Sequence, residues 1–555
     1  MPRRRKQGSD LDRLREVAAE RFGWDTLYDE QVEAMGHLMS GHDVLVVLPT
    51  GAGKSAIYQV PGVLLDGPTV VVSPLISLQR DQVAGLDDSH APEAAAVNST
   101  ESKSSNEDVF ESAGAGETEY VFLSPEQLAK DEVVAAVADS SPSLFVVDEA
   151  HCVSSWGHDF RPDYLRLAPV IERLGHPPVL ALTATAAPPT RADIVERLGM
   201  RDHREVIASF DRPNIHLAVS RFQSDDDKRA AVVEHVTRAP KPGLVYAATR
   251  KDTEAYAEAL TERDVRAAAY HAGLKAADRE RVQQRFMDDE VDVVVATSAF
   301  GMGIDKPNVR FVVHASITDS LDSYYQEIGR GGRDDEPAQA RLFYRPEDLS
   351  LQKFLTANKA PTNAVGEVAE ALRGTDQPLR PRDLDQETDA SRGRQTRATN
   401  LLEQAEVVTS TADGRLEYAD DALSAKEAVE RAVEVSESHQ RMIRSRISMV
   451  RGYAETTGCR RQFLLGYFGE NLRQPCGRCD TCEDQDLTTH AQPSAREADY
   501  PPGMRVQHPE FGDGVVLRVE NDRVTVLFDD GGYKTLALEA VEGQDLLRPG
   551  VRPQP

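Results

Sequence analysis

A short segment near the start of the chain combines glycines, a lysine and a serine in a spacing that suits phosphate chemistry. The segment TGAGKS, residues 50–55, follows an apolar run at residues 44–48 and precedes a helix-like stretch. Glycine lets backbone N–H groups approach an anion closely, and the amino end of a helix adds partial positive charge. A lysine in this position reaches the terminal phosphates of a nucleotide, and the hydroxyl after it can hold Mg²⁺. The residues predicted to bind a nucleotide here are Thr50, Gly51, Gly53, Lys54 and Ser55.

Two acids end a second apolar run, SLFVVDEAH, at residues 143–151. Asp148 is predicted to coordinate Mg²⁺ together with Ser55, and Glu149 is predicted to polarise the attacking water. The glycine loop and the acid pair each lie at the carboxyl end of a predicted strand. Open α/β sheets bind ligands at these ends. A simple glycine-rich turn is the alternative for the loop alone, because Pro49 precedes the loop and the strict pattern lacks its first glycine.

Four of the five cysteines are clustered in one short segment, with the spacing C-x16-C-x2-C-x2-C. Soft thiolate ligands in a closed set of four suit a structural, tetrahedral Zn²⁺ without a catalytic water. The alternative is four free thiols, and the fifth cysteine, Cys152, is expected to be a packed thiol. The predicted zinc ligands are Cys459, Cys476, Cys479 and Cys482.

Composition limits the class of protein. A chain of 555 residues is too long for one core, so several domains are expected. No run of eighteen apolar residues predicts a membrane span, and the basic start MPRRRKQGSD has no apolar segment behind it, so a secretory signal is not expected. The net charge of −28 argues against a nucleic-acid binder, although binding depends on the local charge.

Seven segments occur in an order that resembles the helicases of superfamily 2, and in detail the RecQ DNA helicases. They are LPTGAGKS, SPLISLQRDQV, VVDEAHCVSSWGHDFRPDY, LALTATA, AYHAGL, VVVATSAFGMGIDKPNVRFVVH and SYYQEIGRGGRD. The aromatic loop at residues 150–164 and the cysteine segment are the most specific of the matching parts. The resemblance implies an α/β fold with two tandem RecA-like phosphate-loop domains and ATP between them.

The resemblance also assigns roles around the nucleotide. Arg333 is the expected arginine finger, Arg330 a second phosphate contact, and Gln326 a coupling residue between the domains. Gln31 would hydrogen-bond the adenine edge and Trp24 would stack on the base, although simple packing is the alternative for Trp24. The family usually has a basic residue at Tyr28.

Further residues are expected to contact DNA or to couple it to hydrolysis. In the family, the aromatic loop senses single-stranded DNA, and its rings can stack on bases without sequence preference. Packing between the domains is the alternative for these rings. The candidates are Ser73, Arg80, His151, Trp156, His158, Phe160, Arg161, Thr183, Thr185, Thr297 and Asp305.

The rest of the chain is expected to form smaller modules. Two short helices, a third at residues 391–405 and a hairpin predict a winged helix, with a purely structural helical spacer as the alternative. A long basic helix leads to the zinc segment, and alternating short runs after residue 503 predict an all-β barrel of the SH3 or Tudor type. This barrel resembles those of UvrD-type helicases and is expected to dock a protein; no HRDC-like bundle is recognised.

The expected division of the chain has seven parts. A basic arm and two RecA-like domains come first, followed by the winged helix, the zinc-binding region, a linker and the barrel. Their boundaries are 1–20, 21–208, 209–347, 348–424, 425–484, 485–500 and 501–549.

The resemblance implies an ATP-dependent 3′-to-5′ DNA helicase of recombination and repair that uses ATP, Mg²⁺ and one structural Zn²⁺. Its expected partners are single-stranded and forked DNA, and its expected location is the bacterial cytoplasm, at the nucleoid. The alternatives are an RNA helicase or duplex translocase with the same motor, and a nucleic-acid scaffold with an inactive ATPase.

Overall fold

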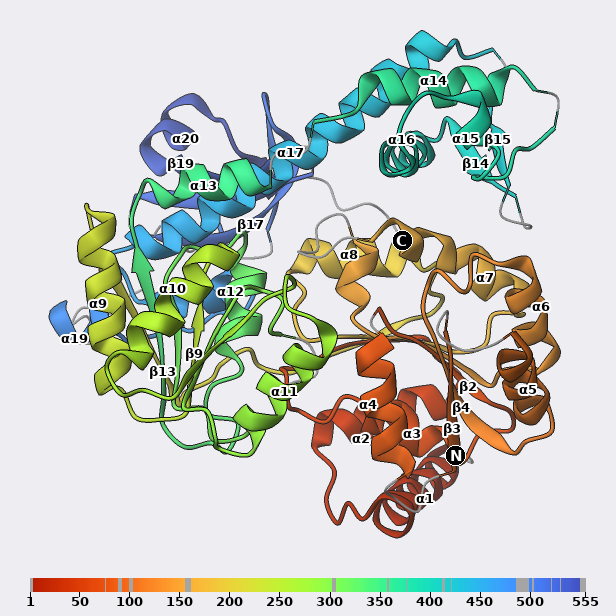
Figure 1. Ribbon diagram of the computed structural model, residues 1–555, viewed down its shortest axis with the longest axis horizontal. Coiled ribbons are helices and arrows are strands. Elements are labelled where there is room, and N and C mark those ends of the chain that lie inside the picture. The colour runs from red at the N-terminus through yellow and green to blue at the C-terminus, as the bar shows by residue number, and fades with distance from the viewer. Residues whose placement is uncertain are drawn as a thin grey trace. The chain divides into compact units, whose positions relative to one another are not determined.

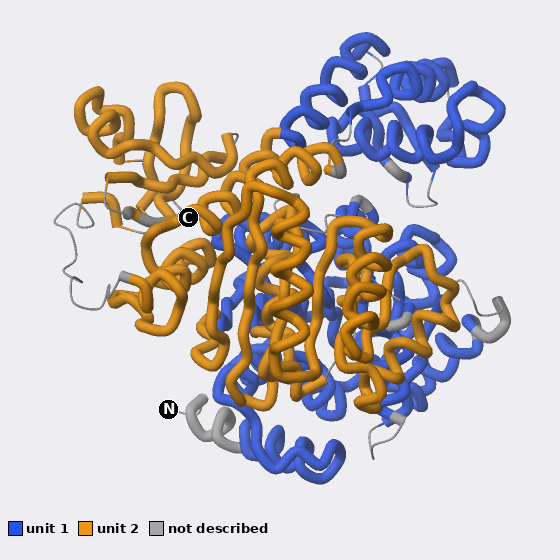
Figure 2. Tube along the Cα trace, turned by 60° about the vertical axis from the view of Figure 1, so that its left-hand side comes forward, with its two compact units in different colours: residues 1–48, 52–208, 358–440 blue, residues 49–51, 209–357, 441–555 orange. Residues whose placement is uncertain are grey.

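The computed structural model of the protein contains two compact units, and each unit is built from more than one stretch of the chain. It describes residues 3–74, 76–87, 92–98, 103–154, 161–301, 306–356, 359–375, 377–411, 415–420, 422–485, 499–501, 504–520, 522–529 and 531–549. Figure 2 colours the first unit, residues 1–48, 52–208 and 358–440, in blue. The second unit, in orange, contains residues 49–51, 209–357 and 441–555.

The first unit is built around a seven-stranded parallel sheet (Figure 1). Most of its strands are apolar and buried along their whole length, as parallel strands covered on both faces must be. In sheet order the strands are β3 (Glu93–Val97), β4 (Thr118–Leu123), β2 (Thr69–Val72), β5 (Leu144–Val147), β6 (Val179–Thr183), β1 (Val44–Val47) and β7 (Arg204–Ile207).

Helices between the strands cover this sheet and complete its core. The helix α2 packs against β1 and β7, whereas α5 packs against β3 and β4. The helices and 3₁₀ turns are α1 (Arg3–Phe22), α2 (Asp29–Met39), α3 (Ala56–Gly62), α4 (Ile76–Asp87), α5 (Lys103–Gly114), α6 (Asp131–Asp139), η1 (Ala150–Val153), η2 (Pro162–Arg166), α7 (Leu167–Arg173) and α8 (Pro188–Arg197).

The second unit contains a six-stranded parallel sheet with the same strand–helix rhythm. In sheet order its strands are β10 (Ala267–Tyr270), β11 (Val293–Ala296), β9 (Gly243–Tyr246), β12 (Phe311–His314), β13 (Ala338–Tyr344) and β8 (Ile215–Arg221). Its helices are α9 (Asp225–Arg238), α10 (Arg250–Thr261), α11 (Ala276–Met287), α12 (Leu321–Ile328) and α13 (Asp348–Leu355).

A small helical module with its own apolar core follows in the first unit. Three helices precede an antiparallel hairpin, whose turn at residues 412–414 lies outside the described residues. The elements are α14 (Thr362–Arg373), α15 (Leu384–Glu387), α16 (Arg392–Gln404), β14 (Val408–Ser410) and β15 (Leu416–Tyr418). The 31-residue helix α17 (Ala425–Glu455) then begins in the first unit and ends in the second.

The end of the second unit consists of two short helices and an antiparallel sheet. Cys459 directly precedes α18 (Arg460–Tyr467), and Cys482 lies in α19 (Asp480–Gln485). The five-stranded sheet, with helix α20 (Leu538–Gln544), is called the barrel below. Its strands, in sheet order, are β19 (Gly532–Ala537), β18 (Arg523–Phe528), β17 (Gly512–Glu520), β16 (Arg505–His508) and β20 (Arg548–Pro549).

These elements confirm the predicted fold class: two parallel α/β domains of RecA type, a helical zinc-binding region and a C-terminal antiparallel sheet. Within the described residues, no helix has both the length and the apolar character that a membrane crossing requires.

Candidate nucleotide site and zinc centre

The phosphate loop joins β1 to α3 and adopts a conformation that only glycine takes easily. Gly51 and Gly53 have φ angles of +87° and +65°, in the left-handed region that strains residues with a Cβ atom. A Cβ atom on Gly53 would also lie 2.7 Å from the amide nitrogen of Gln31. Both predicted glycines are therefore needed for the backbone path of the loop.

Gln31 is tied to the backbone of this loop. Its buried side chain donates from Nε2 to the carbonyl oxygens of Ala52, at 3.1 Å, and Gly53, at 2.9 Å. Its Oε1 accepts from the backbone N–H of Tyr28 at 2.9 Å. Reading an adenine edge would need these bonds to be exchanged, so in this structure Gln31 positions the loop.

Trp24 has a close aromatic neighbour in the protein. Its ring stacks on Phe22, with centroids 4.8 Å apart and planes at 16°, and it packs against the first unit's core. This contact uses a ring face that could otherwise meet a base. Tyr28, where the family usually has a basic residue, is 66% exposed.

The two predicted charges of the site influence each other. Burial and the Glu149 carboxylate raise the pKa of Asp148 to about 7, and the Lys54 ammonium opposes that rise. Lys54 Nζ donates to the carbonyl oxygen of Leu48 at 3.2 Å. A buried carboxyl with a raised pKa is poorly solvated as an anion, so a cation beside it would be favoured. Ser55, in the same loop, is the N-cap residue of α3.

The acid pair is connected to the TAT segment by a chain of polar contacts. Glu149 has a φ angle of +49°, and its Oε2 lies 3.2 Å from Nδ1 of His151. That nitrogen is 3.0 Å from the hydroxyl of Thr183, which donates to the carbonyl oxygen of Thr185 at 3.0 Å. The path therefore runs from Glu149 through His151 and Thr183 to Thr185.

The aromatic loop is anchored at both described ends. The backbone N–H of Arg161 donates to the carbonyl oxygen of Cys152 at 3.0 Å, and its Nη1 donates to the carbonyl oxygen of Pro74 at 2.9 Å. Three candidates of this loop, Trp156, His158 and Phe160, lie outside the described residues. Of the neighbouring candidates, Ser73 is fully buried, whereas Arg80 is exposed on α4.

In the second unit, the arginine loop at residues 329–333 follows α12. Arg330 is buried, Arg333 and Gln326 are half-buried, and Thr297 lies at the end of β11. Asp305 lies outside the described residues.

Two residues that sequence reasoning missed hold this loop. The guanidinium of Arg212 donates to the carbonyl oxygens of Gly329, Gly331 and Gly332, at 3.3, 3.0 and 3.0 Å. Asn214 Nδ2 donates to Gly332 at 2.7 Å. The short segment DRPN that contains both residues offered no recognisable signal, because their partners come much later in the chain.

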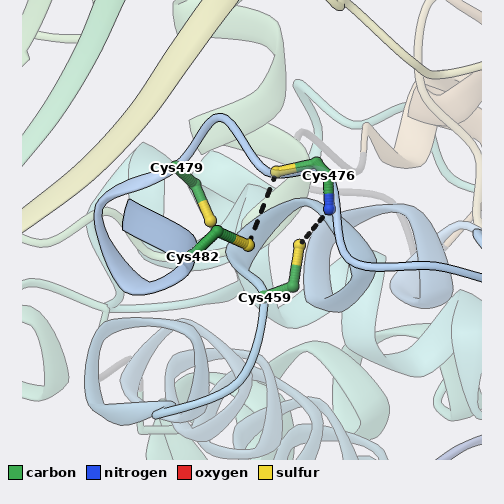
Figure 3. Close-up of side chains that lie close together, drawn as sticks. All are labelled: Cys459, Cys476, Cys479 and Cys482. Atoms are coloured by element: carbon green, nitrogen blue, oxygen red, sulfur yellow. Dashed lines mark hydrogen bonds between the residues drawn. The ribbon is translucent and has the colours of Figure 1, made fainter. Parts of the chain in front are cut away.

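The four predicted cysteines meet in one cluster in the second unit (Figure 3). Their sulfur atoms all lie within 4.8 Å of one another, and Cys476 and Cys482 are 4.0 Å apart, far beyond a disulfide bond. Tetrahedral Zn–S bonds of about 2.3 Å need sulfurs about 3.8 Å apart, so small side-chain adjustments would complete the set. The backbone N–H groups of Cys476 and Arg478 donate to sulfurs, at 3.3 and 3.4 Å, as they would to thiolates. The cluster therefore fits zinc.

The zinc cluster lies against the edge of the second sheet. Cys479 forms a β-bridge with Leu217 of β8, and the Asp480 carboxylate accepts from the backbone N–H of Val219 at 2.8 Å. Arg461 donates to the carbonyl oxygen of Ile215 at 2.7 Å. The edge strand β8 is thus capped by residues that surround the cysteines.

Comparison with known proteins agrees with this geometry. Three family models match in order: DEAD/DEAH box helicase at residues 28–194, the helicase conserved C-terminal domain at residues 227–335, and RecQ zinc-binding at residues 419–483. The zinc-binding match includes all four clustered cysteines.

Curated relatives cover most of the chain. An ATP-dependent DNA helicase RecQ of Haemophilus influenzae is 36% identical over 465 residues, which are 83% of this chain and 62% of the relative. A probable ATP-dependent DNA helicase RecS of Bacillus subtilis is 35% identical over 489 residues, 88% of this chain and 95% of the relative. The chain thus spans about three fifths of the former protein and nearly all of the latter.

Solved structures share the fold at low identity. The DUF1998 helicase MrfA bound to DNA and AMPPNP matches with a TM-score of 0.53 and 17% identity, over 74% of this chain and 62% of that one. The helicase Lhr of Mycobacterium smegmatis, bound to single-stranded DNA and AMP-PNP, has a TM-score of 0.50 and 19% identity, over 78% and 61%. With the ordered motifs, the four-cysteine cluster and the RecS relative, the chain belongs to the RecQ family of ATP-dependent DNA helicases.

Proposed function

We propose that this chain is an ATP-dependent DNA helicase that moves 3′ to 5′ on single-stranded DNA and unwinds duplexes during recombination and repair. The observation that carries the proposal is the convergence around the first sheet: a loop whose left-handed positions are glycines, Lys54 within electrostatic reach of Asp148, and the path from Glu149 to Thr185. This arrangement can bind a phosphate chain, activate a water and transmit the state of the acids to a neighbouring segment.

Each residue at the nucleotide has a proposed role. The loop residues Thr50, Gly51 and Gly53 hold phosphates, Ser55 and Asp148 hold Mg²⁺, and Glu149 polarises water. Arg333 acts as the arginine finger, Arg330 contacts phosphate, and Gln326 couples the domains. Gln31 and Trp24 lie at the base end, where Gln31 also positions the loop.

The DNA is contacted by backbone-binding residues and by the aromatic loop. We assign Ser73, Arg80 and Arg161 to the strand, with Trp156 and Phe160 stacking on bases. Coupling to hydrolysis then uses a set of polar residues: His151, His158, Thr183, Thr185, Thr297 and Asp305.

Zinc supplies a structural crosslink in the proposed protein. Bound by Cys459, Cys476, Cys479 and Cys482, one ion would fold the segment around it, because metal binding and folding are linked. The proposed division into modules keeps the boundaries 1–20, 21–208, 209–347, 348–424, 425–484, 485–500 and 501–549, with a winged helix in the fourth.

The partners follow from the same proposal. Single-stranded and forked DNA are the substrates, and the barrel docks a protein of the replication, repair or transcription machinery. The protein would act in the bacterial cytoplasm, at the nucleoid.

The decisive experiment measures ATP hydrolysis and unwinding with matched nucleic acids. We expect hydrolysis to rise at least about tenfold with single-stranded DNA and far less with RNA of the same sequence, and unwinding to need a 3′ tail. Equal stimulation by RNA would favour an RNA helicase, and stimulation by blunt duplex alone would favour a translocase. A chain that hydrolyses no ATP under any of these conditions would contradict the proposal.

A further inference from the structure

A groove of about 950 Å³ lies between the last part of α17 and the barrel strands β18 and β19, within the second unit. The end of α17 and the two residues after it form one wall, over residues 441–457, and the barrel forms the other, over residues 522–535. None of the predicted nucleotide, zinc or DNA-coupling residues lines this groove. It is therefore a surface without a role in the proposed motor.

The helical wall is a stripe of arginines. Arg441, Arg444, Ser448 and Arg451 follow one another at intervals of three or four residues, so they share one face of α17, and all four are exposed. At a rise of about 1.5 Å per residue, the stripe is about 15 Å long. Among the described residues, no ion pair involves Arg441 or Arg444.

The barrel wall adds two more cations. Arg523 is exposed, and Lys534 Nζ lies 5.0 Å from the centre of the Phe511 ring. The groove includes two acids, Glu455 and Asp522, which pair with Arg451 at 3.0 Å and with Arg523 at 3.9 Å. Five cations therefore face two carboxylates, in a chain whose net charge is −28. Such a local excess attracts an anion strongly.

The lining selects the class of anion. The hydroxyls of Thr456 and Thr535 can donate to phosphate oxygens beside the guanidinium groups. The aromatic residues of the groove, Phe463 and Tyr533, are only 2% and 6% exposed, so they offer no platform for stacked bases. The groove also lacks the exposed apolar pocket in which a peptide would anchor.

From these observations we propose that the groove binds the sugar–phosphate backbone of DNA, without reading its sequence. The inference rests on the proposed DNA helicase function and adds a second DNA-binding site outside the motor.

The groove is attached firmly to the second sheet. Tyr533 in its barrel wall donates from its hydroxyl to the hydroxyl of Tyr467 at 3.1 Å, and Tyr467 in turn donates to the carboxylate of Asp322 on α12. All three side chains are buried. DNA held in the groove is thus held by the same unit as the arginine loop that follows α12.

The test compares three proteins in DNA binding. They are the wild-type full chain, the double variant Arg441→Gln/Arg444→Gln, and a charge-matched control, Arg238→Gln/Arg263→Gln, at exposed positions at the end of α9 and in the turn after α10. Anisotropy titrations without nucleotide use a labelled single strand and a labelled duplex, each over a series of salt concentrations. Melting temperature and zinc content check that the variants are folded.

We expect weaker DNA binding by the groove variant and a shallower dependence of log Kd on log salt. Two lost phosphate contacts reduce the slope by about 1.8 for duplex, or by about 1.4 for a single strand. The arm in which the slope changes identifies which form of DNA occupies the groove, and the control variant should match the wild type.

Two failures are distinguishable. If the wild type binds DNA and the groove variant binds both substrates with unchanged affinity and slope, the groove inference is wrong, and the groove is left for an acidic protein partner. If the wild type itself binds neither DNA, the proposed function fails as well.

Discussion

The two parallel sheets share an architecture but differ in the contacts made by the polar residues around the ends of their strands. Beside the first sheet, burial and Glu149 raise the pKa of Asp148, and the ammonium of Lys54, in the glycine loop, opposes that rise. In the second sheet, His314 is paired with Glu327 at 2.7 Å, and Arg212 is bonded to the carbonyl groups of the arginine loop. The first sheet thus carries a buried acid whose charge is poorly compensated, whereas the polar groups beside the second sheet are paired with other groups of the protein.

The sheets also differ in what their stability depends on. Strand β8 of the second sheet is capped by the cysteine segment, through Leu217, Val219 and Ile215. If this cap matters, disturbing zinc should affect the second unit and spare the first. The following predictions test both halves of the comparison.

The largest effect is expected from Cys479→Ser. Removal of one of four thiolates should abolish tight zinc binding, whose free energy in small zinc modules is about 10–16 kcal/mol. Metal analysis should show about one zinc per wild-type chain and almost none in the variant. Hydrogen exchange should show lost protection in β8 and unchanged protection in β5 and β6. The control Cys152→Ser, which changes a buried thiol outside the cluster, should keep its zinc.

Two results for Cys479→Ser would contradict this prediction. If the Cys479→Ser variant keeps its zinc, or if the first sheet loses protection along with β8, the cysteine cluster does not stabilise the second sheet selectively.

The next largest effect is expected from Lys54→Ala. Loss of the only lysine of the glycine loop should reduce ATP hydrolysis by about 100- to 1000-fold, because an electrostatic contact to the developing charge disappears. Melting temperature should stay unchanged, because Lys54 has little role in the core. Lys353→Ala, at an exposed position of α13, is the control and should hydrolyse ATP normally. Normal turnover by Lys54→Ala would refute the nucleotide site.

A smaller effect is expected from Arg212→Ala. Three carbonyl groups of the arginine loop would lose their donor, and the loop would become less well positioned. DNA-stimulated kcat should fall by about 10- to 100-fold, while nucleotide affinity in the absence of DNA changes little. Arg238→Ala, on α9, is the matched control. An equal loss of nucleotide affinity would mean that Arg212 does more than hold the loop.

The smallest effect concerns Glu119 in the first sheet. Burial raises the pKa of its carboxyl to about 8, and within the described residues its Oε1 has no hydrogen-bond partner. The folded chain therefore binds this proton more tightly than the unfolded chain, and stability falls as the pH rises from about 4.5 to 8. Glu119→Gln should melt about 1–2 °C higher than the wild type at pH 8.5 and equally at pH 5.

The control for this pH effect is Glu117→Gln, two residues away and exposed. It should melt like the wild type at both pH values. A gain in the control, or a Glu119→Gln gain that does not depend on pH, would contradict the assignment to buried charge.

Sequence reasoning succeeded where the chemistry is carried by neighbouring residues. The glycine loop, the acid pair and the cysteine spacing are contiguous patterns, so the fold class and the family could be predicted, and both are confirmed. The roles of the individual site residues stay predictions. Contacts between distant segments could not be predicted, because nothing in DRPN marks Arg212 and Asn214 as partners of a glycine-rich loop in a remote part of the chain.

The basic groove also could not be predicted from the sequence, because its two walls come from distant segments of the chain. The arginines of its helical wall stand out in the sequence, since they recur on a long helix. The barrel wall contributes Arg523 and Lys534 from strands that lie beyond the zinc segment and read only as part of an all-β module. Net charge misleads here, because it averages a local excess of cations over the acidic remainder of the chain.

The cap on β8 has a consequence for how the protein behaves during synthesis. An uncovered edge strand presents a row of unpaired N–H and C=O groups that can pair with the same strand of another molecule. Chains made under zinc starvation would therefore aggregate through β8 before the individual molecules lose their activity. In this protein, metal supply would act as a safeguard against aggregation, and its shortage would first appear as lost soluble yield.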